Sequence, residues 1–229
     1  MQPAALFVDC YGTLVDGDRA AIEAVTRATS ERAGVDRAQL DRAWLRRFTT
    51  LCAVRVGALF ATQRQLELEA MTDVLGDLGI SWPAAQVADL LEPLFDYWRS
   101  AEPFADAIGF LRTWTLCPVL IVSNIDRDDL ARVRRGLPAV AGVVTSEDAR
   151  AYKPSPAVFR RALTEAGVAA QRVVHVGDSW TSDVEGALGA GLTPVWLDRD
   201  GDGSSADRAE VVRITDLDEL ADCIAALPQ

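Results

Sequence analysis

Five short runs of apolar and β-branched residues recur along the chain, and they constrain its fold more than any other feature. The runs cover residues 6–8, 119–122, 142–144, 173–176 and 194–197. Helical stretches separate most of them, and this alternation is typical of parallel sheets covered by helices on both faces. The sequence therefore predicts an α/β protein with a doubly wound parallel sheet.

The gap between the first two runs is much longer than the others. From 18 to 100 the pattern is helical, with Trp44, Phe48, Leu51 and Arg55 at helical spacing. We expect an inserted all-helical cap domain of about four helices above the strand ends. The expected boundaries are 17–100 for the cap domain and 1–16 with 101–229 for the α/β core domain.

The charge balance limits the partners of the chain. Its 23 basic and 34 acidic residues give a net charge of −11. Such an acidic surface repels phosphate backbones and anionic lipids, so we expect neither nucleic-acid nor membrane binding. A small anionic substrate would need a local basic pocket.

The first apolar run stops at Asp9, too early for a signal peptide or a membrane span, and we expect a soluble, cytoplasmic protein.

The first apolar run ends in a carboxylate, and a Gly-Thr turn follows at once. The segment reads Phe7-Val8-Asp9-Cys10-Tyr11-Gly12-Thr13-Leu14. Asp9 is thus expected at the carboxyl end of a buried strand, where open α/β sheets bind ligands. A carboxylate there can act as a nucleophile and form a covalent intermediate. Strand alternation points Cys10 away from Asp9, which disfavours the thiol as the nucleophile.

Two further segments offer groups that bind anions. Ser123 and Asn124 follow the second run and can both donate hydrogen bonds, although Ser-Asn also forms ordinary turns and caps. Lys153 lies just before a helix that begins with proline, and it would hold a nucleophilic carboxylate and the developing negative charge. A surface lysine before a helix is the alternative interpretation.

Two carboxylates follow the fourth run, in Gly177-Asp178-Ser179-Trp180-Thr181-Ser182-Asp183. Oxygen ligands in a loop suit a hard cation such as Mg²⁺, which takes one or two carboxylates and substrate oxygens. A helix cap with an acidic first turn would explain Asp183 but not Asp178. His175, the single histidine, alternates with valines inside the run, and we interpret it as structural and hydrogen-bonded.

The order of these segments resembles the haloacid dehalogenase superfamily over essentially the whole chain. The resemblance implies a Rossmann-like core, an aspartyl ester intermediate on Asp9, and Lys153 as a catalytic residue. It also implies a substrate pocket that contains Thr13, Ser123 and Asn124.

The residue at position 11, here Tyr11, distinguishes the phosphatases of the superfamily from its 2-haloacid dehalogenases. Phosphatases of the superfamily carry a second Asp at this position, which protonates the leaving group and later activates water. General acid–base catalysis of this kind commonly raises the reaction rate about 10²–10⁴-fold. Tyrosine, with an ordinary pKa of about 10, is a poor base near neutrality. The 2-haloacid dehalogenases carry Asp-x-Tyr-Gly-Thr-Leu, much as here. Their leaving group is a halide that needs no proton, and they need no metal.

The segment after the fourth run favours the phosphatase reaction, because Asp178 and Asp183 resemble the magnesium loop of the phosphatases. Carboxylates near Asp9 would repel one another without a cation. The resemblance therefore implies Mg²⁺ held by Asp9, the Tyr11 backbone carbonyl, Asp178 and Asp183. Dehalogenases instead tend to have a Ser/Asn-rich loop with a single later Asp.

Two arginines of the helical segment are candidates for gripping the substrate. Arg46 follows Trp44-Leu45, a context similar to that of the arginine with which dehalogenases bind the substrate carboxylate, and Arg55 lies on the same apolar stripe as Trp44 and Phe48.

We favour a Mg²⁺-dependent phosphatase that acts on a small anionic substrate through an aspartyl-phosphate on Asp9. A metal-independent 2-haloacid dehalogenase is the alternative, and a non-catalytic binding member of the superfamily is the second alternative.

Overall fold

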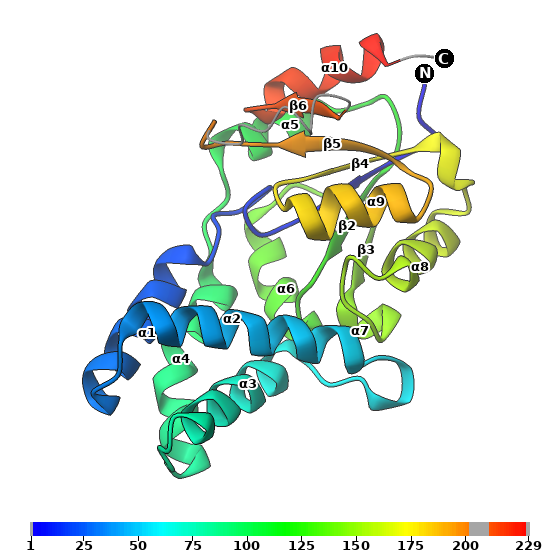
Figure 1. The fold of residues 1–229 in the computed structure, drawn as a ribbon. Coiled ribbons are helices and arrows are strands. Elements are labelled where there is room, and N and C mark those ends of the chain that lie inside the picture. Colours follow the sequence, from blue (N-terminus) through cyan, green and yellow to red (C-terminus); the bar gives the residue numbers. More distant parts are fainter. Residues whose placement is uncertain (1, 202–210, 228–229) are drawn as a thin grey trace.

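A six-stranded, fully parallel sheet forms the centre of the protein (Figure 1). The computed structural model describes residues 2–201 and 211–227. The strand order is β3-β2-β1-β4-β5-β6. The strands are β1 Ala5–Val8, β2 Val119–Ser123, β3 Gly142–Thr145, β4 Val173–Gly177, β5 Thr193–Leu197 and β6 Val212–Ile214. The predicted α/β fold is confirmed, and β6 is a strand that the sequence did not predict.

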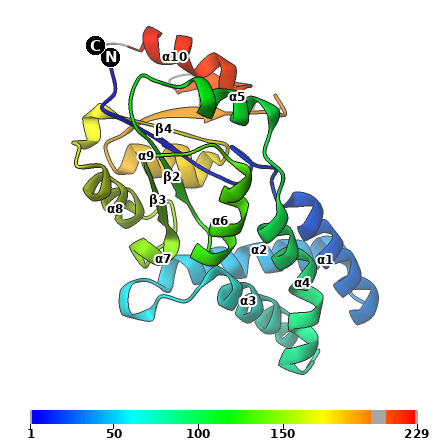
Figure 2. The same ribbon diagram turned by 180° about the vertical axis from the view of Figure 1, so that it is seen from behind.

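Helices cover both faces of the sheet (Figures 1 and 2). In β1, Leu6 and Val8 pack into the apolar cluster of one face, and Ala5 and Phe7 pack into that of the other. The first face carries α5 Ala105–Thr113, α6 Arg127–Val133 and α10 Leu220–Ala226; the second carries α8 Pro156–Ala166 and α9 Gly186–Gly189. A one-turn helix, α7 Ser146–Ala149, follows β3. Burial on both faces explains why the central strands are continuously apolar.

Of the five α-helices between the first two strands, four are grouped together to one side of the sheet (Figure 1). They are α1 Arg19–Ala33, α2 Arg37–Val54, α3 Gln63–Asp77 and α4 Ala84–Ser100. The Asp36 side chain caps α2, and Thr62 with Gln65 forms a capping box at α3. No strand occurs in the described part of 19–100, as expected. The division into a cap domain with boundaries at 17 and 100 stays a prediction.

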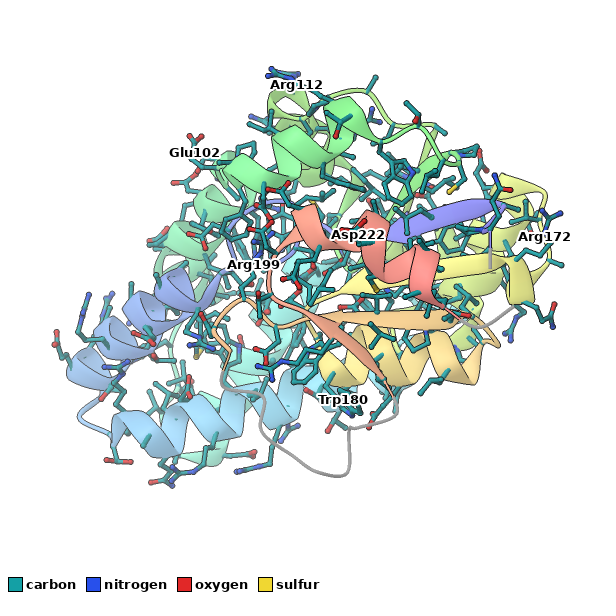
Figure 3. All side chains as sticks on the ribbon, turned by 90° about the horizontal axis from the view of Figure 1, so that it is seen from above. Glu102, Arg112, Arg172, Trp180, Arg199 and Asp222 are labelled. Carbon is teal, nitrogen blue, oxygen red and sulfur yellow. The ribbon has the colours of Figure 1, made fainter. Side chains whose placement is uncertain are left out.

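The surface carries many charged side chains. Glu102, Arg112 and Arg172 project outward from the periphery of the molecule (Figure 3). Across residues 2–201 and 211–227, no helix has the length and apolarity needed to cross a membrane.

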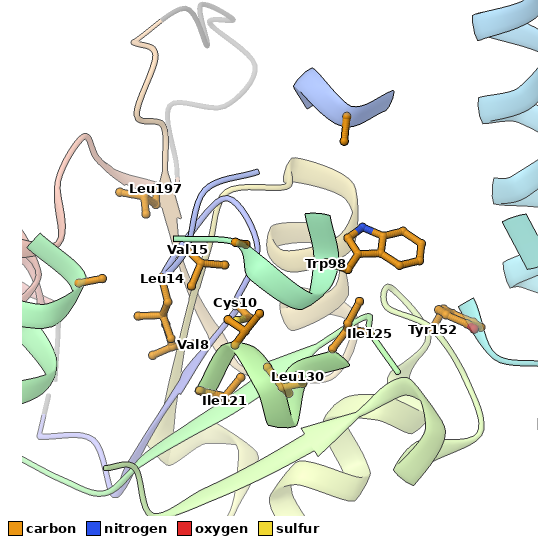
Figure 4. Close-up of a cluster of buried hydrophobic side chains, with 14 of the residues drawn as sticks. Val8, Cys10, Leu14, Val15, Trp98, Ile121, Ile125, Leu130, Tyr152 and Leu197 are labelled. Carbon is orange, nitrogen blue, oxygen red and sulfur yellow. The ribbon is translucent and has the colours of Figure 1, made fainter. Parts of the chain in front are cut away.

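Cys10 lies in the apolar core beneath the carboxyl edge of the sheet, near Val8, Ile121 and Leu130 (Figure 4). Its side chain has no exposed surface. Burial, and then the negative charge of Asp9, raise the pKa of the Cys10 thiol well above its ordinary value. A thiolate nucleophile is therefore disfavoured at this position.

Candidate active site

The carboxyl ends of β1, β2 and β4 meet at one edge of the sheet and form an acidic cavity of about 170 Å³. Asp9 follows β1, Ser123 ends β2 and Asp178 follows β4, and all three line this cavity. The three strands are adjacent and parallel, so side chains that are distant in sequence converge here. We refer to this space as the acidic cavity.

Lys153 is the cationic centre of the cavity. Its Nζ lies 2.7 Å from Asp9 Oδ1 and 2.5 Å from Asp183 Oδ1. His175 Nε2 lies 2.9 Å from the same Asp183 oxygen, so the histidine is hydrogen-bonded as the sequence suggested. The chain His175–Asp183–Lys153–Asp9 thus connects a buried strand residue to the proposed nucleophile.

Asn124 holds the backbone of Lys153. Its Oδ1 accepts a hydrogen bond from the Lys153 backbone N–H at 2.6 Å, and its Nδ2 donates to the Lys153 carbonyl at 3.0 Å. Asn124 lines the cavity, but its side-chain amide is committed to this contact. Its main effect in the structure is to position Lys153, whereas Ser123 makes no such contact and remains available to an anion.

The Gly-Thr turn after β1 holds Asp178. Thr13 Oγ1 donates to Asp178 Oδ1 at 3.1 Å, and Thr13 is fully buried, away from the lining of the cavity. Gly12 has a φ of 86°, and a Cβ there would overlap the Asp178 carboxyl. Glycine is therefore required at this turn both for its backbone conformation and for the close approach of Asp178.

The carboxyls of the cavity have strongly perturbed pKa values. Burial, opposed by Lys153, raises the pKa of Asp9. Burial and then the charges of Asp9 and Asp183 raise the pKa of Asp178 to about 8. For Asp183, burial alone would raise the pKa, but Lys153 and His175 outweigh it and lower the pKa to about 2. Asp183 is thus the permanent counter-ion of Lys153.

The three carboxyls have the composition of a divalent-cation site. One oxygen from each of Asp9, Asp178 and Asp183 lies within 4.8 Å of the others. The Asp183 oxygens already accept from Lys153, His175 and the Ser179 backbone N–H. Asp9 and Asp178 therefore retain more lone pairs for a cation, and the donor set fits Mg²⁺. The metal-ligand assignment of Asp9, Tyr11, Asp178 and Asp183 stays a prediction.

Tyr11 lines the acidic cavity, but its hydroxyl donates to the Trp98 carbonyl of α4 at 2.5 Å. Burial, and then nearby acidic groups, raise the pKa of Tyr11 above its ordinary value. The phenol proton is therefore tightly held, and it is committed to the Trp98 carbonyl.

The structure does not bring the two candidate arginines to the acidic cavity. Arg46 is exposed on α2, and Arg55 at the end of α2 forms an ion pair with Glu69. Neither lines the acidic cavity. Their assignment to substrate binding stays a prediction that this arrangement does not support.

Three of the lining residues that the sequence reasoning missed come from the helical segment: Asp18, Gln63 and Trp98. Trp98 Nε1 donates to Asp18 Oδ2 at 3.0 Å. Asp18 and Gln63 both lie where a helix begins, and the capping box at Thr62 would have located the start of α3. The sequence held no signal that Trp98 would face Asp18, because that contact spans 80 residues.

Together the fold and the site define an α/β protein with a strand-end carboxylate, a paired lysine and an acidic loop. A family model described as haloacid dehalogenase-like hydrolase matches residues 3–191. The chain therefore belongs to the haloacid dehalogenase-like hydrolase family, which confirms the resemblance seen in the sequence.

Two curated relatives match parts of the chain. Haloacid dehalogenase-like hydrolase domain-containing protein 3 of Danio rerio is 36% identical over 156 residues, which cover 65% of this chain and 64% of that protein. Phosphoserine phosphatase of Thermus thermophilus is 37% identical over 78 residues, or 34% of this chain and 31% of that protein. Less than two thirds of either relative is thus matched.

Solved structures share the fold over nearly the full length. L-2-haloacid dehalogenase of Xanthobacter autotrophicus, with chloropropionic acid covalently bound, has a TM-score of 0.71 at 18% identity, covering 99% of this chain and 100% of that one. A putative hydrolase of Bacillus subtilis bound to magnesium has a TM-score of 0.73 at 18% identity, covering 98% and 100%. At this identity the likeness shows the fold alone.

Proposed function

We propose that this protein is a Mg²⁺-dependent phosphatase that acts on a small anionic substrate through an aspartyl-phosphate on Asp9. The convergence of Asp178 and Asp183 on Asp9, with oxygens within 4.8 Å, carries the proposal. Lys153 is the one cation that lines the acidic cavity among the described residues. Three carboxyls against one ammonium favour a further cation, and phosphoryl transfer depends mainly on such charge neutralisation.

The proposed reaction has two displacement steps. An Asp9 oxygen attacks phosphorus, the ester bond breaks, and the departing oxygen takes a proton from water. A water molecule then attacks the acyl phosphate, which releases inorganic phosphate and regenerates the Asp9 carboxylate. Lys153 balances the charge of Asp9, and the Ser123 hydroxyl is placed to donate to a phosphoryl oxygen.

The proposed metal would be held mainly by Asp9 and Asp178, with the Tyr11 carbonyl and a water-mediated contact to Asp183. When bound, Mg²⁺ neutralises the developing charge on the phosphoryl oxygens. Tyr11 keeps its proton on the Trp98 carbonyl, so it does not protonate the leaving group. We therefore expect the best substrates to have leaving groups that need no proton, such as aryl or acyl phosphates.

A 2-haloacid dehalogenase is the second candidate, favoured by Tyr11 in the Asp-x-Tyr-Gly-Thr turn. Asp9 would attack the halogen-bearing carbon and expel halide, and water would cleave the ester. Against it, a 2-haloacid carries a carboxylate, and Arg46 and Arg55 do not line the acidic cavity.

One paired assay separates these candidates. Hydrolysis of 4-nitrophenyl phosphate with Mg²⁺ is compared with chloride release from 2-chloropropionate in excess EDTA. The proposal predicts phosphate release that EDTA abolishes, and no chloride release. Chloride release in EDTA without phosphatase activity would establish the dehalogenase instead. Inactivity in both assays would favour a non-catalytic binding member.

A further inference from the structure

A second cavity, of about 220 Å³, lies beside the acidic one among α1, α2 and α3. Asp18 and Gln63 line both cavities. The two cavities are therefore adjacent, and the Asp18 and Gln63 side chains lie where they meet. An apolar cavity of about 150 Å³ can hold a benzene molecule, so this one accepts a group of only a few heavy atoms. We refer to it as the helical cavity.

The apolar walls of the helical cavity are aromatic in part. They include Ile22 of α1 together with Trp44 and Phe48 of α2. Trp44 is 4% exposed, so its ring is fixed by packing. Aromatic faces attract cations, and indole does so most strongly.

The polar part of the helical cavity is acidic. Asp18, Asp41 and Glu67 line it, and none of the described residues that line it is a lysine or an arginine. Glu67 is 6% exposed. Burial and then the charge of Asp18 raise the pKa of Glu67 well above its ordinary value, while the Trp44 indole N–H opposes the rise. Glu67 is thus a buried carboxyl without a cationic partner.

Two buried polar atoms on the walls also lack hydrogen-bond partners. Gln63 is 8% exposed, and its Oε1 accepts no hydrogen bond; Trp44 Nε1 makes none of good geometry. Orphaned polar atoms are uncommon in protein interiors and indicate a missing partner. Gln63 lines both cavities, and its unpartnered Oε1 is buried beside the place where they meet.

From these features we infer that the substrate reaches from the acidic cavity into the helical cavity and that the helical cavity binds its ammonium group; the substrate is therefore a small phosphate compound whose leaving group carries an amine and needs no proton. The carboxyls and aromatic faces attract the ammonium, and Gln63 Oε1 accepts one of its hydrogens once the side chain turns toward the ligand. An ammonium beside Asp18 and Glu67 favours their ionised forms and is stabilised by them, whereas a carboxylate on the leaving group gains no such partner. The phosphate end of this inference rests on the proposed phosphatase function.

Non-hydrolysable phosphonates test the inference without any effect of leaving-group chemistry. Calorimetry with Mg²⁺ compares 2-aminoethylphosphonate with n-propylphosphonate, which has nearly the same shape but no charge on its chain. We expect the amine to bind at least tenfold more tightly, a difference of about 1.4 kcal/mol. Equal affinities in a protein that hydrolyses 4-nitrophenyl phosphate would overturn the inference and leave the phosphatase proposal intact.

Variants assign the preference to the helical cavity. Glu67→Gln keeps the side-chain shape, and it should bring the two affinities within about threefold of each other. Glu31→Gln removes the same charge from an exposed site on α1 and should keep the tenfold preference. If Glu67→Gln fails to fold by circular dichroism, Asp41→Asn at an exposed position should still reduce the preference measurably. A preference unchanged in the folded variants would overturn the assignment.

Binding of n-butylammonium, compared with n-butanol, tests the helical cavity alone. This measurement needs neither a metal nor phosphatase activity, so it remains decisive if the phosphatase proposal fails. We expect the ammonium to bind more tightly than the alcohol, and this advantage to be lost in Glu67→Gln. Equal or undetectable binding of both would overturn the inference.

Discussion

At the scale of single residues, Lys153 determines the electrostatics of the site. Its ammonium contacts both Asp9 and Asp183, and Asn124 fixes its backbone. Burial opposes the charge of Lys153, but Asp183 and Asp9 outweigh it and raise its pKa above the ordinary value. The lysine therefore stays cationic at any working pH, and it orients Asp9 for attack.

Replacing Asp9 by asparagine should abolish turnover of 4-nitrophenyl phosphate without unfolding the protein. The amide has the same shape but is not a nucleophile, so we expect less than about 1% of the wild-type kcat, in line with loss of a covalent catalyst. Steady-state kinetics and circular dichroism measure the two effects. Asp89→Asn, at an exposed site on α4, is the matched control and should stay fully active. Activity above a few per cent in Asp9→Asn would remove the nucleophile assignment.

Tyr11→Phe should affect stability more than turnover. The change removes the hydrogen bond to the Trp98 carbonyl, which typically contributes about 1 kcal/mol. Because the phenol is not placed to donate to substrate, we expect kcat to stay within about threefold while the thermal midpoint falls. A loss of the order of 10²-fold in kcat, the size expected of general acid catalysis, would show that Tyr11 is the proton donor.

At the scale of elements, the loop after β4 positions the carboxyls. Gly177 ends this strand, and a Cβ there would overlap the Asp183 carboxyl. The Gly177→Ala variant must displace Asp183 and with it Lys153, so we expect kcat to fall at least tenfold and the thermal midpoint to drop. Gly109→Ala on α5 is the control, because no atom lies within 4 Å of the added carbon. Removing a helical glycine there should be neutral or stabilising by up to about 1 kcal/mol. Equal behaviour of the two variants would contradict the steric argument.

The strands of the core could be predicted because they are buried on both faces and read as continuous apolar runs. Each of the five predicted runs lies within a strand of the structure. The sequence did not predict the strand β6, because Val212 and Arg213 are exposed and Ile214 is its one buried residue. Periodicity cannot separate such a short edge strand from a loop. The helical nature of 18–100 followed from the same kind of pattern, here with a helical period.

At the scale of the whole molecule, the sequence located the residues at strand ends but not those supplied by helices. Asp9, Ser123 and Asp178 converge because parallel strands share one carboxyl edge. Which side chains α1, α2 and α3 turn toward that edge depends on how the helices pack. The stripe of α2 illustrates this, since Trp44 and Leu51 are buried as expected while Arg55 pairs with Glu69.

The acidic cavity should couple the stability of the whole protein to Mg²⁺ and pH. The folded pKa of Asp178, about 8, exceeds the ordinary value of 3.8, so folding favours its protonated form. The stability that this group contributes is fully present below about pH 4 and is lost as the pH rises through about 8. A divalent cation competes with that proton and favours the ionised carboxyls, so Mg²⁺ should stabilise the protein more at pH 8.5 than at pH 6.

Thermal unfolding with 5 mM MgCl₂, compared with NaCl of equal ionic strength, measures this effect; that concentration is roughly the level needed to saturate a weak carboxylate site. For a chain of this size, each kcal/mol of added stability corresponds to about 2–4 °C in the thermal midpoint. We expect a rise of that order at pH 8.5, a smaller one at pH 6, and none in Asp178→Asn, which cannot ionise at this position. The same stabilisation by both salts at both pH values would show that the carboxyls hold no specific cation. That result would also remove the main support for the phosphatase over the metal-independent dehalogenase.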